Sequence, residues 1–168
     1  GQTLGGSYQS ASYVGSVGTV TLSFDTTTTG RLTWSGGTIP ITRYEIVSGG
    51  VALGPNSGMP QKGWWWSSAE SGRGYFLEVQ GSTLFLAAYM YDSSGQAVWY
   101  ISQGAMTSTS LYSGSLTEFR GGQTLGGTYN EPTSSSSVGS ISIQFSSQTT
   151  ATMTLPNGSQ VALTRYTF

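Results

Sequence analysis

The sequence contains no cysteine and no histidine. Without thiolate or imidazole groups, the chain cannot build the usual zinc sites from its own side chains. The same absence excludes disulfide bonds, Ser-His-Asp catalysis and Cys-His catalysis within this chain. We therefore expect no metal, no cofactor and no catalytic residue.

Charged residues are also scarce, at 8% of the chain, and the net charge is −1. A nucleic-acid-binding surface needs clustered lysine and arginine, so we expect no nucleic-acid partner. No apolar run approaches the length of a membrane-spanning helix, so we expect no membrane span.

Glycine, serine and threonine are plentiful in place of charge, and the glycines alone number 25. This composition favours short strands and tight turns over helices. A low-charge chain rich in serine, threonine and glycine is typical of secreted bacterial proteins. We therefore expect a bacterial protein that is secreted or held in the cell envelope.

The start of the sequence returns near its end. GQTLGGSY at 1–8 returns as GQTLGGTY at 122–129, and VGTVTLSF at 17–24 returns as VGSISIQF at 138–145. Such self-similarity indicates repeated structural units, because each copy is one supersecondary unit. The chain is thus predicted to contain half a unit followed by a whole one.

The repeat predicts the domain organisation. Residues 1–46 are interpreted as the second half of a preceding repeat unit, and residues 47–62 as a linker. Residues 63–168 are interpreted as a complete β unit. Its tryptophan-rich half is 63–120, and its other half, 121–168, repeats 1–46.

Alternation of apolar and polar residues predicts strands almost throughout. In 18–25, for example, Val20, Leu22 and Phe24 share one face. About eight or nine antiparallel strands within 63–168 predict an up-and-down barrel of the lipocalin or streptavidin type, or a sandwich, with an extra half-unit of strands. The predicted strands are 18–25, 31–35, 38–46, 75–80, 83–91, 96–103, 111–119, 140–146, 151–155 and 160–166.

The segment GWWWSSAESGRG at 63–74 carries a resemblance to a known family. Together with GQTLGGTY at 122–129 and the ending LTRY at 163–166, it resembles an uncharacterised family of secreted bacterial tandem modules. That family opens on GWWW-x-x-x-E-S-G-x-G, and its second half runs from GQTL-x-G-x-Y to LTR-aromatic. The chain departs from this pattern at Ser67 and Ser68, where an Asn-Pro pair is expected. The resemblance implies no activity, cofactor or catalytic residue.

The three consecutive tryptophans are the first candidate site. On a strand, Trp64 and Trp66 share one face and Trp65 lies on the other. Exposed aromatic faces can bind sugar rings through apolar contact, whereas the alternative is core packing for two of the three. The strand 83–91 is apolar on both faces, so it is either covered twice or lines a ligand site. The candidate ligand-binding residues are Trp64, Trp65, Trp66, Tyr89, Tyr91 and Trp99.

Two glutamates, Glu70 and Glu78, form the second candidate site. A pair of carboxylates could hydrolyse a glycosidic bond if they lay across it. The alternative is structural, because arginine clamps carboxylates in bidentate ion pairs. The candidate members of structural ion pairs are Arg43, Glu70, Arg73, Glu78 and Arg165.

Short loops give two further interpretations. Asp92 opens the segment DSSG, which has too few carboxylates for a calcium loop and is interpreted as a turn that Asp92 caps. Gly72 and Gly74 are expected to supply positive φ angles in a tight connection.

The sequence therefore favours a non-catalytic, secreted bacterial β-module with an accessory or ligand-binding role. The expected partners are carbohydrate or other domains of a larger exported protein. A homodimer formed by strand exchange is also expected, because half a repeat cannot bury its apolar face alone. The alternatives are a purely structural spacer or capping repeat, and a glycoside hydrolase that uses Glu70 and Glu78.

Overall fold

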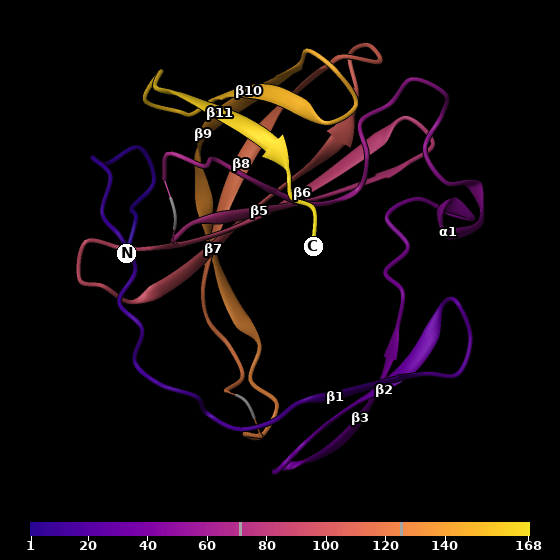
Figure 1. Cartoon of the computed structure of the whole chain (residues 1–168), viewed down its shortest axis with the longest axis vertical. Coiled ribbons are helices and arrows are strands. Elements are labelled where there is room, and N and C mark those ends of the chain that lie inside the picture. Colours follow the sequence, from indigo (N-terminus) through magenta and orange to yellow (C-terminus); the bar gives the residue numbers. More distant parts are fainter. Residues whose placement is uncertain (71, 125) are drawn as a thin grey trace.

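The computed structural model describes residues 1–70, 72–124 and 126–168 (Figure 1). The described chain is nearly all β-structure, as the sequence predicts. The strands are β1 (Thr21–Phe24), β2 (Thr29–Trp34), β3 (Gly37–Thr42), β4 (Gly63–Trp66), β5 (Gly74–Gln80), β6 (Thr83–Tyr91), β7 (Ala97–Ala105), β8 (Leu111–Gly121), β9 (Pro132–Phe145), β10 (Thr150–Thr154) and β11 (Gln160–Arg165).

Strands β4 to β11 form a closed antiparallel barrel. Each strand pairs with the next one along the chain, and β11 pairs back with β4 through Thr164 with Trp66 and Arg165 with Trp65. This order is an up-and-down barrel. The predicted fold class is therefore confirmed. Of the two predicted architectures, the structure has the barrel and not the sandwich.

The interior of the barrel is filled by side chains. Trp65, Tyr75 and Tyr112 are fully buried there among aliphatic residues from strands β5 to β11. The indole Nε1 of Trp65 donates a hydrogen bond to the Gln61 carbonyl at 3.0 Å. A ring of eight strands leaves an interior just wide enough for side chains. The inside of this barrel is therefore a packed core.

Strands β8 and β9 form a long hairpin that extends beyond the ring, downward in Figure 1. The sequence predicted only 140–146 for the second of these strands. The added length pairs through its backbone, with Phe119 opposite Ser134 and Gly121 opposite Pro132. The added residues are rich in serine and show no alternation of apolar and polar side chains. The sequence therefore predicted a strand shorter than the observed β9.

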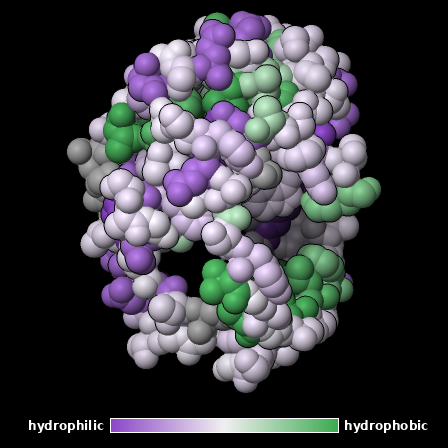
Figure 2. All heavy atoms as spheres, turned by 60° about the vertical axis from the view of Figure 1, so that its left-hand side comes forward, coloured by the Kyte–Doolittle hydropathy of each residue, from purple (hydrophilic) through white to green (hydrophobic). Residues whose placement is uncertain are grey.

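Strands β1 to β3 form a separate sheet, called the small sheet here. Figure 1 places it at the lower right, away from the barrel. Figure 2 shows green, hydrophobic surface in the lower part of the molecule, beside a dark opening. The sequence predicts an extra half-unit of strands, and the small sheet provides it as a sheet that pairs with no barrel strand among the described residues.

Two other parts of residues 1–46 reach the barrel. At the start of the chain, the Asn157 side-chain amide donates to the Gly5 carbonyl at 3.0 Å. After β3, residues 43–46 lie on the outer face of β5, β6 and β7. Gln80 fixes this segment, because its side-chain amide donates to the Tyr44 carbonyl and accepts from the Ile46 amide, both at 3.0 Å. The ring of Tyr44 packs on Phe85 with centroids 5.8 Å apart. This part of the outer face is therefore covered.

The predicted linker, 47–62, also packs on the barrel. It contains one helical turn, α1 (Gly50–Leu53), and the Gly81 amide donates to the Gly54 carbonyl at 2.8 Å. Met59 and Pro60 are buried. Within the described part of the chain, helices of the length and apolarity needed to cross a membrane are absent.

Candidate ligand-binding site

The three tryptophans of β4 alternate between the two faces of the barrel wall. Trp65 points inward and is fully buried, whereas Trp64 is 40% exposed on the outer face. Trp66 also faces outward and is half-buried, with its ring edge-on to Tyr166 at 5.3 Å. Only one of the three is therefore part of the core, where the structural interpretation of the sequence expected two.

Trp64 belongs to a set of aromatic rings on the outer face of the barrel. It lies opposite Phe76 in the pairing of β4 with β5, and their ring centroids are 6.1 Å apart in an edge-on arrangement. Tyr89 of β6 packs on its ring at 5.6 Å and is itself 48% exposed. Such contacts hold the ring planes in place while leaving part of each open to solvent.

A glycine makes this arrangement possible. A side chain at Gly74 would put its Cβ 3.0 Å from the Trp64 ring, so the indole can lie over β5 only because none is present. The sequence had assigned positive φ to both Gly72 and Gly74. Gly72 has φ of 99°, but the φ angle of Gly74 is not positive. The role of Gly74 is therefore to let the Trp64 ring approach the backbone of β5 closely.

The exposed rings border a concavity of about 390 Å³, called the aromatic groove here. Trp64, Tyr89, Tyr91 and Trp99 line it together with Arg73. Trp99 is held by stacking on Phe119, with centroids 6.3 Å apart and ring planes at 6°. Four of the six predicted ligand-binding residues therefore lie around one hollow.

A second hollow of about 260 Å³ lies next to the aromatic groove. It is lined by Trp66, Tyr166 and Phe168, and also by Trp64 and Arg73. Because Trp64 and Arg73 line both hollows, the two hollows share part of their walls.

Arg73 is the charged group closest to these hollows. Its side chain is 2% exposed and forms an ion pair with Glu70, three residues earlier. The Arg73 Nε and the Tyr75 hydroxyl are both buried without a hydrogen-bond partner in the described part of the chain. Burial raises the pKa of Tyr75 to about 12, and the nearby Arg73 charge only partly offsets this.

The second glutamate lies in a different setting. Glu78, on the outer face of β5, forms an ion pair with Arg43 from the segment that follows β3. Arg165 donates instead to the backbone carbonyls of Lys62, at 2.8 Å, and Tyr166. Glu70 and Glu78 are therefore held by different arginines, and this arrangement adds no support to the hydrolase alternative.

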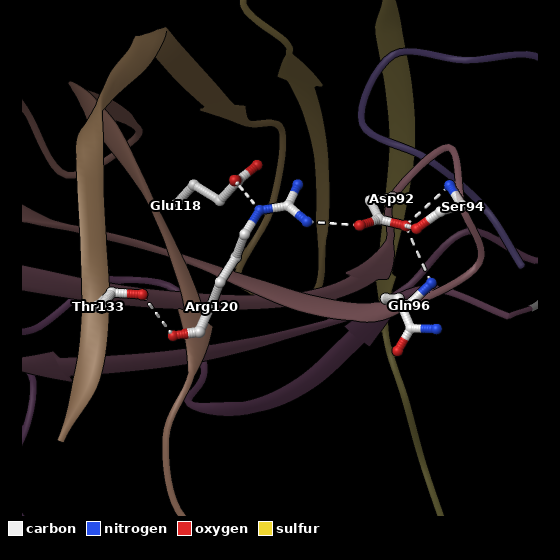
Figure 3. A network of polar contacts seen from close by, with 6 residues as sticks. All are labelled: Asp92, Ser94, Gln96, Glu118, Arg120 and Thr133. Atoms are coloured by element: carbon white, nitrogen blue, oxygen red, sulfur yellow. Dashed lines mark hydrogen bonds and ion pairs between the residues drawn. The ribbon is translucent and has the colours of Figure 1, made fainter. Parts of the chain in front are cut away.

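Figure 3 shows a third polar cluster, near the turn between β6 and β7. Asp92 accepts hydrogen bonds from the Ser94 amide and hydroxyl and from the Gln96 amide, so it caps its own turn. Arg120 of β8 contacts both Asp92 and Glu118. The Ser94 hydroxyl, followed by Arg120 and the Gln96 amide, lowers the pKa of Asp92 well below its usual range. The carboxylates of Glu118 and Asp92 in turn raise the pKa of Arg120.

The segment at the start of the chain contacts residues that line the aromatic groove. Gly1 lies against the Tyr91 ring, and the Tyr91 amide donates to the Gln2 carbonyl at 3.0 Å. Farther along, the backbone of Ala11 passes Gly72. Two residues that line the groove, Tyr91 and Gly72, are therefore in contact with a segment distant in sequence.

The sequence missed several members of the site. Phe76 and Phe119 support Trp64 and Trp99 from adjacent strands, and Tyr166 with Phe168 completes the second hollow. The signal that could have found Phe76 is cross-strand pairing, because it lies directly opposite Trp64. Phe168 lies beyond the last strand and carries no such signal.

Comparison with known proteins gives no assignment. No family model matches the chain, and neither curated proteins nor solved structures contain a significant match.

Proposed function

We propose that this chain is a non-catalytic module that binds carbohydrate in the aromatic groove on the outside of its barrel. The observation that carries the proposal is the pair Trp64 and Tyr89. Both rings are packed at 5.6 Å and remain 40% and 48% exposed. Large aromatic side chains left open at a concavity usually mark a binding surface.

The geometry suits a flat ligand with apolar faces. Trp64, Tyr89 and Trp99 come from three different strands, and each is held by a neighbouring ring or by the sheet. Rings fixed before binding lose little side-chain entropy when a ligand arrives. The C–H faces of a sugar ring can pack on such surfaces, and its hydroxyls can stay at the solvent-exposed edge.

The electrostatics favour an uncharged ligand. Arg73 is the charged side chain that lines the groove, and Glu70 already neutralises it in an ion pair. A strongly anionic ligand would have to compete with that carboxylate. Neutral glycans therefore fit the groove better than acidic ones.

The module is proposed to act as an accessory part of a larger, exported bacterial protein. The low charge and the richness in glycine, serine and threonine support this setting. A purely structural spacer is the competing function, and it requires the exposed rings to serve packing alone.

Binding can be tested by probing the fluorescently labelled chain on an array of neutral and acidic glycans, then titrating the hits by calorimetry. We expect binding to neutral glycans, with affinity reduced at least tenfold in Trp64→Ala and Tyr89→Ala. Tyr13→Ala is the matched control, because Tyr13 is 87% exposed and lies outside the residues that line the groove.

Two results would contradict the proposal. One is the absence of binding across the array by a folded chain. The other is binding that Tyr13→Ala weakens as much as Trp64→Ala does. Either result would favour the spacer function.

A further inference from the structure

The small sheet repeats, strand for strand, the pairing of three barrel strands. Leu22 of β1 lies opposite Leu32 of β2, and at the same spacing Ile143 of β9 lies opposite Met153 of β10. Leu32 in turn lies opposite Ile39 of β3, as Met153 lies opposite Val161 of β11. The two sets of strands therefore share order, direction and register.

The two sets differ in what covers them. Leu22 and Phe24 are 54% and 72% exposed, whereas their barrel counterparts Ile143 and Phe145 are 0% and 4% exposed. Ile39 is also exposed, and its counterpart is buried. The small sheet thus presents to solvent the face that the barrel turns into its core. A three-stranded sheet with such a face bare is poorly stabilised alone.

The barrel itself shows what covers this face. The side chains opposite β9, β10 and β11 come from β4 to β8, within residues 63–121, and include Trp65, Tyr75 and Leu77. The two outer strands of the small sheet also correspond to barrel strands that pair with this segment. β11 pairs with β4 and β9 pairs with β8, whereas the corresponding edges of β3 and β1 are open in the described part of the chain.

We propose that the small sheet is a docking surface for a five-stranded, tryptophan-rich segment of the type of residues 63–121, carried ahead of Gly1 on the same polypeptide. Docking would close a second barrel around Leu22, Phe24 and Ile39. The docked segment would join the GQTLGG motif at 1–6 in the same way as β8 joins its copy within this chain. There, Gly121 at the end of β8 leads directly into the GQTLGG motif at 122–127.

A second copy of the chain is a poorer occupant. Its own residues 63–121 are already closed by β9 to β11 of the same copy. Exchange would displace those strands and expose an equal apolar face elsewhere. A covalently joined segment also has a high effective concentration, which a separate chain lacks. This inference is independent of ligand binding in the aromatic groove.

The test joins residues 63–121 directly ahead of residues 1–168 and measures amide hydrogen exchange in the fused and parent chains. We expect fast exchange in β1, β2 and β3 of the parent chain. In the fused chain, these amides should exchange as slowly as those of β9, β10 and β11. An unfolded fused chain counts against the proposal, because two complete barrels should be at least as stable as one.

Matched substitutions identify the face involved. Leu22→Asp should leave the unfolding midpoint of the parent chain nearly unchanged, and should abolish the added protection in the fused chain. Ser23→Asp is the control, because its barrel counterpart Gln144 is exposed, and it should be tolerated in both chains. The proposal is overturned if β1 to β3 stay unprotected in the fused chain. It is also overturned if the parent chain forms a dimer, by light scattering, that Leu22→Asp dissociates.

Discussion

Trp64 and Trp65 are neighbours in the sequence and lie on opposite sides of the barrel wall. Trp65 is fully buried in the core, and Trp64 is 40% exposed beside the aromatic groove. One strand therefore supplies both a core residue and a candidate binding residue.

Alanine substitution should separate these two roles. Trp65→Ala should lower the free energy of unfolding by about 3–5 kcal/mol, because it removes a large side chain from a packed interior. Trp64→Ala should cost about 1 kcal/mol, since it loses only partial contacts with Phe76 and Tyr89. Urea denaturation measures both. If Trp64→Ala is as costly as Trp65→Ala, the exposed indole serves packing, and the spacer function is favoured.

Two buried tyrosines should respond oppositely to loss of the hydroxyl. The Tyr75 hydroxyl has no hydrogen-bond partner among the described residues, so Tyr75→Phe should raise stability by about 1 kcal/mol. The Tyr112 hydroxyl is hydrogen-bonded to Ser102 at 2.7 Å inside the barrel. Tyr112→Phe should lower stability by about 1–2 kcal/mol, because Ser102 is left unpaired. Thermal unfolding that shows the same sign for both variants would contradict this expectation.

Tyr75 should also affect stability at alkaline pH. Burial raises its pKa to about 12 in the folded chain, from about 10 in an unfolded chain. The folded state therefore holds this proton more tightly. The associated stability is complete below about pH 10 and is lost as the pH rises through 12. Tyr75→Phe should make stability fall less steeply between these values, as measured by denaturation at a series of pH values.

The two glutamate ion pairs should differ in strength. Glu70→Gln leaves the Arg73 guanidinium buried without its charged partner, and should cost about 1–3 kcal/mol. Glu78→Gln should cost less than about 1 kcal/mol, because the Arg43 side chain is 28% exposed and can be hydrated. Chemical denaturation of the two variants in parallel tests the difference. Equal costs would mean that burial of the arginine does not decide the effect.

Asp92 should contribute to stability at acid pH. Its hydrogen bonds with Ser94, Arg120 and Gln96 lower its pKa in the folded chain. The contribution is present above the unfolded pKa of about 4, and it is lost as the pH falls through the lower folded pKa. Asp92→Asn should flatten the decline of the melting temperature between neutral and acid pH. Ser94→Ala, which removes the largest contribution, should flatten it partly.

Much of the barrel could be predicted from local sequence. The strand at 83–91 was placed at its observed bounds, because apolar residues mark both of its faces and glycines flank it. Polar or short segments were harder. The serine-rich start of β9 pairs through its backbone, and the helical turn at 50–53 has too few residues to show a period.

The candidate site was predicted only in part, for a physical reason. Alternation shows that Trp64 and Trp65 face opposite ways, but it does not show which side is the core. That depends on strand order, which brings Tyr89 of β6 against Trp64 and places Trp99 of β7 at the same hollow. The position of the small sheet was also beyond local sequence, because its apolar face matches that of buried strands and yet lies exposed.

The pairing of β11 with β4 has a consequence for the order of folding. β4 is the first strand of the barrel to leave the ribosome. Its open edge is paired only after β11, the last strand, has been synthesised. Trp65 lies in this closing seam, opposite Arg165. A nascent chain that ends before β11 therefore keeps an unpaired edge beside this indole, and burial of the indole reports that the ring has closed.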